Sequence, residues 1–233
     1  MDDLPAEEVL EAIERAVRAL LEEAGVTPPP VDALALARGH FGWRVEEVEA
    51  PPRRGRRRER GDTAGPIRLP AGLSEEARQA VAARRVGEVL EGRVLAELGA
   101  PREGPRPSLA NRIAERLLLP LDAFARDARE LGFDVLRLKE RYWTASHEAI
   151  ARRLPELPEP CVVALTEGER VVWRRGSAGA AGRRLTPAER RCREAVERSG
   201  EPTLVRYEGW TVQGWPLPGA GDRVLLRGVP ETE

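Results

Sequence analysis

The chain has 233 residues, of which 33% are charged, 41% hydrophobic and 4% aromatic, and its formal net charge is -1. This composition is too apolar for a disordered chain and too polar for a membrane protein. The longest stretch without a charge, residues 209–221, contains two prolines and is shorter than the roughly 20 apolar residues that span a bilayer. The acidic N-terminus differs from the basic and then apolar start of a secretion signal, so we expect a cytoplasmic protein.

Counts of single residue types add two constraints. The only cysteines are Cys161 and Cys192, which excludes a disulfide framework and a cysteine-based zinc knuckle. Lys139 is the only lysine and Asn111 the only asparagine, whereas the chain has 20 prolines. Depletion of thermolabile side chains together with abundant proline indicates a thermophilic source.

Basic charge is concentrated in one segment. Residues 50–65 hold almost no apolar side chain, which predicts a long exposed loop or a hairpin tip. Because each phosphate contact releases counterions, the segment is also a candidate anion-binding arm for nucleic acid, although no aromatic residue is interleaved to stack on bases. The arginines of this arm are Arg53, Arg54, Arg56, Arg57, Arg58 and Arg60.

Apolar residues at helical spacing predict two helices near the N-terminus. The first covers residues 9–21 and the second residues 31–38. An extended segment around Trp43 follows, and a short strand is expected at residues 67–69, after the arginine segment. The N-terminal part is therefore expected to be helical with a short sheet.

The middle of the chain contains a series of helix start signals. The first predicted helix there extends to Gly92, and the others end near residues 120, 132, 142 and 154. Prolines interrupt residues 155–160, which predicts a boundary between one domain of residues 1–157 and a second of residues 158–233. The N-cap candidates are Ser74, Ser108, Asp122, Asp134 and Ser146.

The C-terminal part changes to strand patterns. Residues 162–173 read as a hairpin, and residues 210–215 and 224–226 as two further strands. Between them, Thr186 has the chemistry of an N-cap, followed by proline at the first helical position and Glu189 at N3. We therefore expect a small α+β module with the order strand, strand, helix, strand, strand.

Three strings resemble the ImmA/IrrE family of small HExxH metallopeptidases. Residues 83–88 read A-R-R-V-G-E where the family has A-H-E-x-x-H, and residues 110–120 fit the family's A-N-x-x-A-x-x-L-L-x-P. Residues 143–154 resemble a later segment of the form F-x-V-S-x-x-A-x-x-R-L. The resemblance covers roughly residues 31–154. It implies an α+β protein with a helix-rich, zincin-like peptidase domain and, in some relatives, a sensor-like C-terminal domain resembling the GAF fold.

The zinc chemistry of the resembled family is missing from the aligned positions. A zinc peptidase needs two imidazoles at i and i+4 and a carboxylate that activates the metal-bound water. Arg84 and Glu88 occupy the two histidine positions, and Arg85 occupies that of the catalytic glutamate. With Asn111 they form a degenerate peptidase site for which we expect no metal, no cofactor and no catalysis. The pair at i and i+4 either bridges a closed cleft or lies on a solvated helix face.

Two further features have alternative interpretations. Residues 134–154 fit a helix-turn-helix with Arg152 and Arg153 facing phosphate, or two helices packed on the peptidase core. Three tryptophans of the C-terminal module belong to its core or to a ligand cage. These tryptophans are Trp173, Trp210 and Trp215.

The resemblance implies a function, because relatives cleave transcriptional repressors in stress or mobile-element regulation. The sequence therefore predicts a pseudo-metallopeptidase that acts as a regulatory or adaptor protein by binding a protein partner, such as a transcriptional regulator. The alternative is a nucleic-acid-binding regulator that uses the arginine segment or residues 134–154. Neither interpretation specifies an oligomeric state.

Overall fold

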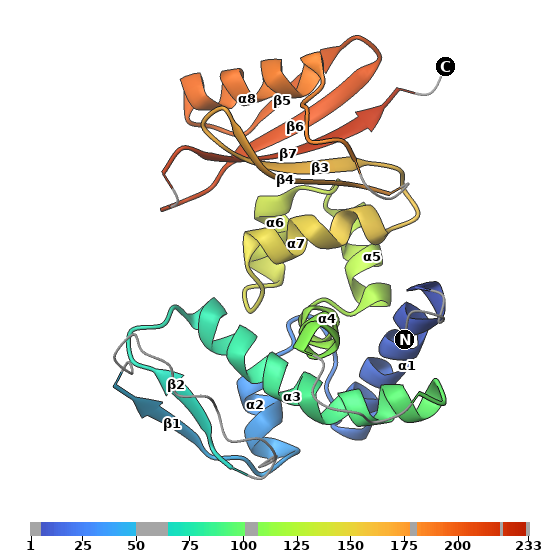
Figure 1. The fold of residues 1–233 in the computed structure, drawn as a ribbon. Coiled ribbons are helices and arrows are strands. Elements are labelled where there is room, and N and C mark those ends of the chain that lie inside the picture. Colours follow the sequence, from blue (N-terminus) through green and yellow to red (C-terminus); the bar gives the residue numbers. More distant parts are fainter. Residues whose placement is uncertain (1–5, 50–64, 101–106, 178–180, 220, 232–233) are drawn as a thin grey trace. The chain divides into compact units, whose positions relative to one another are not determined.

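The computed structural model describes residues 6–49, 65–100, 107–177, 181–219 and 221–231. Contacts divide the chain into two compact units. Unit 1 comprises residues 1–127 and 140–146, and unit 2 comprises residues 128–139 and 147–233. The expected α+β class is confirmed, with a helical part and a C-terminal sheet (Figure 1).

Unit 1 is built from amphipathic helices whose apolar faces are buried. The periodic residues of the first helix, such as Ile13 and Leu20, are completely buried, as are Val86 of α3 and Ile113 of α4. Burial of one apolar stripe on each helix supplies most of the stabilisation of such a unit. The helices are α1 (Ala6–Glu23), α2 (Ala33–Gly39), α3 (Glu75–Glu97), α4 (Pro107–Leu118) and α5 (Leu121–Glu130), which ends in unit 2.

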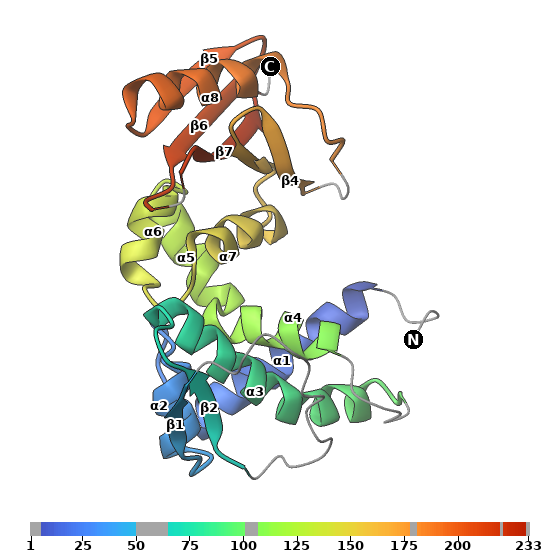
Figure 2. The same cartoon turned by 60° about the vertical axis from the view of Figure 1, so that its left-hand side comes forward.

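The two strands that the structure describes in unit 1 pair in parallel. β1 (Val45–Val48) lies beside β2 (Ile67–Pro70) in the register Val45 to Ile67 (Figure 2). Parallel strands need a crossover connection, so β1 and β2 are not the two arms of one hairpin. The arginines of the segment between them lie outside the described residues. Ile67 and Leu69 are buried on the side of β2 that contacts α3, which positions this helix against the sheet.

Three predicted helix boundaries, one end and two starts, differ from the structure. α3 continues five residues past Gly92, because Val94 and Leu95 are completely or almost completely buried and outweigh the roughly 1 kcal/mol cost of a helical glycine. α4 begins at Pro107, so Ser108 lies inside the first turn and is not its N-cap. Asp122 likewise lies in the first turn of α5.

Unit 2 contains an antiparallel sheet of five strands in the order β4-β3-β7-β6-β5. One face packs against α8 (Pro187–Ser199) through a cluster that includes Ala164, Cys192 and Leu226. The predicted Thr186 capping box is confirmed by both of its hydrogen bonds. The strands are β3 (Val162–Glu167), β4 (Arg170–Gly176), β5 (Thr203–Tyr207), β6 (Trp210–Pro216) and β7 (Arg223–Pro230), of which β5 was not predicted.

The opposite face of the same sheet is also covered. Side chains alternate along a strand, so Val163, Leu165 and Leu225 point away from α8, and all three are buried. On this side lie α6 (Val135–Arg141) and α7 (His147–Arg153), followed by a 3-10 turn, Leu154–Glu156 (Figure 1). The division into units therefore differs from the predicted boundary at residue 157, since α7 and residues 135–139 of α6 belong with the sheet.

The three tryptophans of the C-terminal module pack at different places on its sheet. Trp215 is buried, and Trp210 packs against the cluster under α8. Trp173 lies on the other face, with the Arg152 guanidinium 5.1 Å from its ring. The three therefore do not surround one ligand cavity.

Candidate functional site on α3

The candidate site lies in the middle of α3, and local sequence explains the position of this helix. Ser74 accepts a hydrogen bond from the backbone N–H of Ala77 at 3.3 Å, and two glutamates occupy the first turn. Both features stabilise a helix N-terminus. Directly after the first turn of α3, the side chain of Gln79 is fully buried. It accepts a 2.8 Å hydrogen bond from the N–H of Ala33, which links α3 to the start of α2.

The charged residues at the motif positions form a small ion-pair cluster. Arg85 Nη1 lies 2.9 Å from Glu88 Oε2, and these side chains are 20% and 28% exposed. Arg84 Nε lies 3.7 Å from Glu88 Oε1, but the Arg84 side chain is 47% exposed. The carboxylate is thus paired mainly with Arg85, and the geometry of Arg84 agrees with the solvated-face interpretation rather than with a closed cleft.

Aromatic residues extend this cluster. The guanidinium of Arg85 lies 5.8 Å from the ring centroid of Trp43, a cation–π distance, and Trp43 stacks on Phe41 with centroids 4.4 Å apart. Both aromatic side chains are partly exposed. We call Phe41, Trp43, Arg84, Arg85 and Glu88 the α3 surface. Sequence reasoning missed the two aromatic members, because they come from the segment before β1.

α4 packs closely against α3 at Gly87, within the candidate site. Gly87, between Arg85 and Glu88 on the helix, is so close to α4 that a Cβ would lie 2.4 Å from the carbonyl oxygen of Ala110. Asn111 follows Ala110 but has an exposed side chain. The ion pairs thus bring Arg84, Arg85 and Glu88 together on α3, whereas Asn111 belongs to α4.

The donor set of this region does not suit a zinc ion. One carboxylate next to two guanidiniums lacks the imidazole or thiolate ligands that hold zinc, and the positive charges repel a cation. His40 follows α2 and His147 begins α7, in different units. Among the described residues, no group of three or more His, Cys, Asp or Glu side chains could hold a metal ion.

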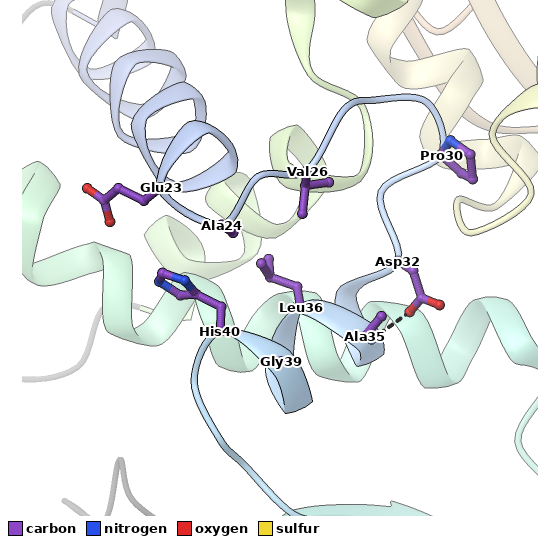
Figure 3. Close-up of a pocket in the computed structure, with 9 residues that line it drawn as sticks. All are labelled: Glu23, Ala24, Val26, Pro30, Asp32, Ala35, Leu36, Gly39 and His40. Atoms are coloured by element: carbon purple, nitrogen blue, oxygen red, sulfur yellow. Dashed lines mark hydrogen bonds between the residues drawn. The ribbon is translucent and has the colours of Figure 1, made fainter.

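A separate pocket of about 350 Å³ lies between the end of α1 and α2 (Figure 3). The carboxylate of Glu23 points away from its centre, while Asp32 accepts a 2.8 Å hydrogen bond from the N–H of Ala35 and so caps α2. The His40 ring contacts Phe41 edge to face. These polar groups do not converge on one point, so the pocket shows no catalytic arrangement.

The structure describes only one of the two segments that the sequence offers as candidates for nucleic-acid binding. Arg53, Arg54, Arg56, Arg57, Arg58 and Arg60 lie outside the described residues. Arg153 is 4% exposed and pairs with Glu156, while Arg152 pairs with Glu148 and covers Trp173. Arg153 is therefore buried within unit 2, whereas the Arg152 side chain is 36% exposed and is held by Glu148 and Trp173.

Comparison with solved structures shows a likeness in fold. No protein-family profile and no curated protein matches the chain. Among solved structures, a Mycobacterium tuberculosis transcriptional regulator is similar over 97% of this chain and 81% of its own chain, with a TM-score of 0.66 and 18% identity. At that identity the likeness shows that the two chains share a fold. Within the described residues, no helix is long and apolar enough to cross a membrane.

Proposed function

We propose that this protein is a non-catalytic regulator of transcription that acts by binding another protein. Its N-terminal part is, in this proposal, an ImmA/IrrE-like pseudo-metallopeptidase that acts in the cytoplasm on stress or mobile-element genes. The observation that carries the proposal is the α3 surface, where Arg85 pairs with Glu88 at 2.9 Å at the positions that a peptidase uses for zinc chemistry.

The chemistry of the α3 surface suits protein recognition. Tryptophan and arginine are the residue types most enriched at binding hot spots, and both are partly exposed here in Trp43 and Arg85. The pairing of Arg85 with Glu88 and its contact with Trp43 hold the guanidinium in place, which lowers the entropy lost on binding. The fold shared with the M. tuberculosis transcriptional regulator supports a regulatory role.

The loss of metal chemistry is tested by elemental analysis of the purified protein. We expect less than about 0.1 zinc per chain after purification without strong chelators. A variant with Arg84→His and Glu88→His is the positive control, because two imidazoles at i and i+4 restore half of a tetrahedral site and should take up zinc from a micromolar solution. About one zinc per wild-type chain would contradict the pseudo-enzyme proposal.

The regulatory role is tested by transcript profiling of a strain that lacks the protein. We expect a limited set of transcripts to change and to return to normal with the wild-type chain. Arg85→Ser should fail to restore them, whereas Arg38→Ser, at an exposed arginine of α2, should restore them. Both variants should fold, with melting temperatures within about 5 °C of the wild type. An unchanged transcript profile in the deletion strain would contradict regulation.

The same strain separates protein binding from the nucleic-acid alternative. A variant with serine in place of Arg54, Arg56, Arg57 and Arg58 should restore the transcripts if the α3 surface is the functional contact. If instead this variant fails and Arg85→Ser succeeds, the arginine segment carries the function and the proposal is wrong.

A further inference from the structure

A second pocket, of about 400 Å³, lies within unit 2, where the β3–β4 turn and the segment before α8 meet the first turns of that helix. Among the described residues, four arginines and one acidic residue, Glu169, line it. We call it the arginine pocket. Its cationic residues are Arg183, Arg184, Arg190 and Arg193.

Most of this positive charge is not neutralised by the protein. In the described part of the chain, no hydrogen bond or ion pair engages Arg183 or Arg184, and Arg190 donates to the carbonyl oxygen of Leu185 at 3.1 Å. Arg193 differs, since it is buried, lies 3.5 Å from Glu197 and donates to the carbonyl oxygen of Gly168. Three guanidiniums therefore keep donors available for a ligand.

The segment that carries the two unengaged arginines is anchored. Arg174 on β4 donates to the carbonyl oxygen of Gly182 at 2.9 Å. The same guanidinium forms a bidentate pair with Glu189, at 3.0 and 3.2 Å, and the Glu189 side chain is completely buried. Leu185, directly after Arg184, is buried in the core under α8. The backbone on both sides of Arg183 and Arg184 is thus held in place before any ligand arrives, which favours affinity.

Nearby carboxylates are already committed to other partners. Glu189 pairs with Arg174 and also accepts the N–H of Thr186 in the capping box. Glu197 and Glu194 lie beside Arg193. A concave site with several guanidiniums and one carboxylate has a positive potential that attracts anions and excludes metal cations.

The size and lining of the arginine pocket indicate the class of ligand. Arginine presents donors in a planar fork that matches phosphate oxygens, so several arginines around one cavity suit a phosphate-bearing molecule. Val171 and Leu185 add an apolar wall, and about 400 Å³ lies in the usual range for small-molecule sites. We propose that unit 2 binds a small phosphorylated metabolite in this pocket, with the phosphates on Arg183, Arg184 and Arg190.

This proposal is independent of the regulatory role, because it concerns binding by the purified chain. Isothermal titration calorimetry with pyrophosphate and with ADP, at about 50 mM salt, is the direct assay. We expect dissociation constants of roughly 1 mM or lower for pyrophosphate and tighter binding of ADP, whose organic part can contact Val171 and Leu185.

A pair of double variants localises the binding. Arg183→Ser with Arg184→Ser should weaken pyrophosphate binding by about tenfold or more, since two charge-assisted contacts are lost. Arg198→Ser with Arg206→Ser removes the same charge from exposed positions outside the pocket and should change affinity by less than about twofold. Both variants should keep the wild-type melting temperature, because no described ion pair is removed.

Three results would overturn the proposal. The first is an absence of heat with about 5 mM pyrophosphate or ADP, a concentration roughly five times the expected dissociation constant. The second is an equal loss of affinity in both double variants. The third is tight binding of a 20-base-pair duplex that depends on Arg183 and Arg184 while the small phosphates fail. The last result would assign these arginines to a nucleic-acid backbone instead.

Discussion

Replacing Gly87 by alanine probes the closest contact at the candidate site. The Cβ of alanine would lie 2.4 Å from the carbonyl oxygen of Ala110 and 3.2 Å from its carbonyl carbon. The first distance is about 1 Å short of ordinary van der Waals contact. Ala110 is buried in the first turns of α4, and its carbonyl is part of the helix backbone, so it cannot rotate away. The two helices must therefore separate to accept the methyl group.

The magnitude follows from two opposing effects. Overpacking of this kind costs about 1–3 kcal/mol, and a rigid backbone obstacle favours the upper part of that range. Alanine is preferred over glycine in a helix by about 1 kcal/mol, which offsets part of the loss. We expect Gly87→Ala to lower the free energy of unfolding by about 1–2 kcal/mol, measured by urea denaturation followed by circular dichroism.

Gly39→Ala is the matched control for this experiment. Gly39 is the last residue of α2, and a Cβ there meets nothing within 4 Å. The same substitution should therefore be neutral or stabilise by up to about 1 kcal/mol. If Gly87→Ala is as harmless as Gly39→Ala, α3 and α4 do not approach each other as closely as described.

The other predictions concern charges and thiols. Arg85→Ala and Glu88→Ala should show a coupling energy of about 0.5 kcal/mol in a double-mutant cycle. Arg84→Ala should lower the free energy of unfolding by less than about 0.3 kcal/mol, since that side chain is half exposed. A larger loss of stability from Arg84→Ala would indicate a closed cleft. Burial raises the pKa of the Cys192 thiol from 9.0 to about 12, so its contribution to stability should be complete below pH 9 and lost as the pH rises toward 12. At pH 8 this thiol should react with Ellman's reagent only as the protein unfolds, and rapid labelling of the native state would refute its burial. Duplex DNA should bind negligibly at about 150 mM salt. The nucleic-acid alternative would be favoured by submicromolar binding whose logarithm falls with the logarithm of salt concentration with a slope of magnitude about 4–6. That binding should be lost when four arginines of residues 53–60 become serine.

Helices whose signals lie within one segment could be predicted from the sequence. The capping box at Thr186 and the apolar stripe of α1 each concern residues a few positions apart, and both predictions are confirmed. The same holds for Asp134, whose side chain accepts the N–H of Leu136 at 2.9 Å at the start of α6. Local hydrogen bonds and spacing are visible in a linear string, so these elements needed no tertiary information.

Features decided by tertiary contacts were missed. Gly92 ends no helix, because burial of residues beyond it outweighs its low propensity. β5 has alternating burial, but Leu204 is 53% exposed and the run is short, so its pattern was too weak without β6 beside it. Parallel pairing of β1 with β2 also depends on how the intervening chain crosses, which periodicity does not encode.

The residues of the candidate site also differ in whether the sequence alone could indicate them. Arg84, Arg85 and Glu88 were found because they share one helix and lie in a string that resembles a known motif. The contact of Trp43 with Arg85 joins two elements, and only the three-dimensional structure reveals it. Gly87 gave a usable signal, since a glycine inside a predicted helix often marks a close approach of another backbone.

The extent of unit 2 follows from the requirement that a buried sheet be covered on both faces. α8 covers Ala164 and Leu226, but the alternate residues Val163, Leu165 and Leu225 are equally buried on the other side. Exposure of three such side chains would cost several kcal/mol, at about 25 cal/mol for each Å² of apolar surface. On that side β3 contacts α7 and the 3-10 turn that follows it, so part of the cover comes from residues before 158. The prolines at residues 155–160 mark a turn inside this unit, because a break in secondary structure and a break between cores are different things.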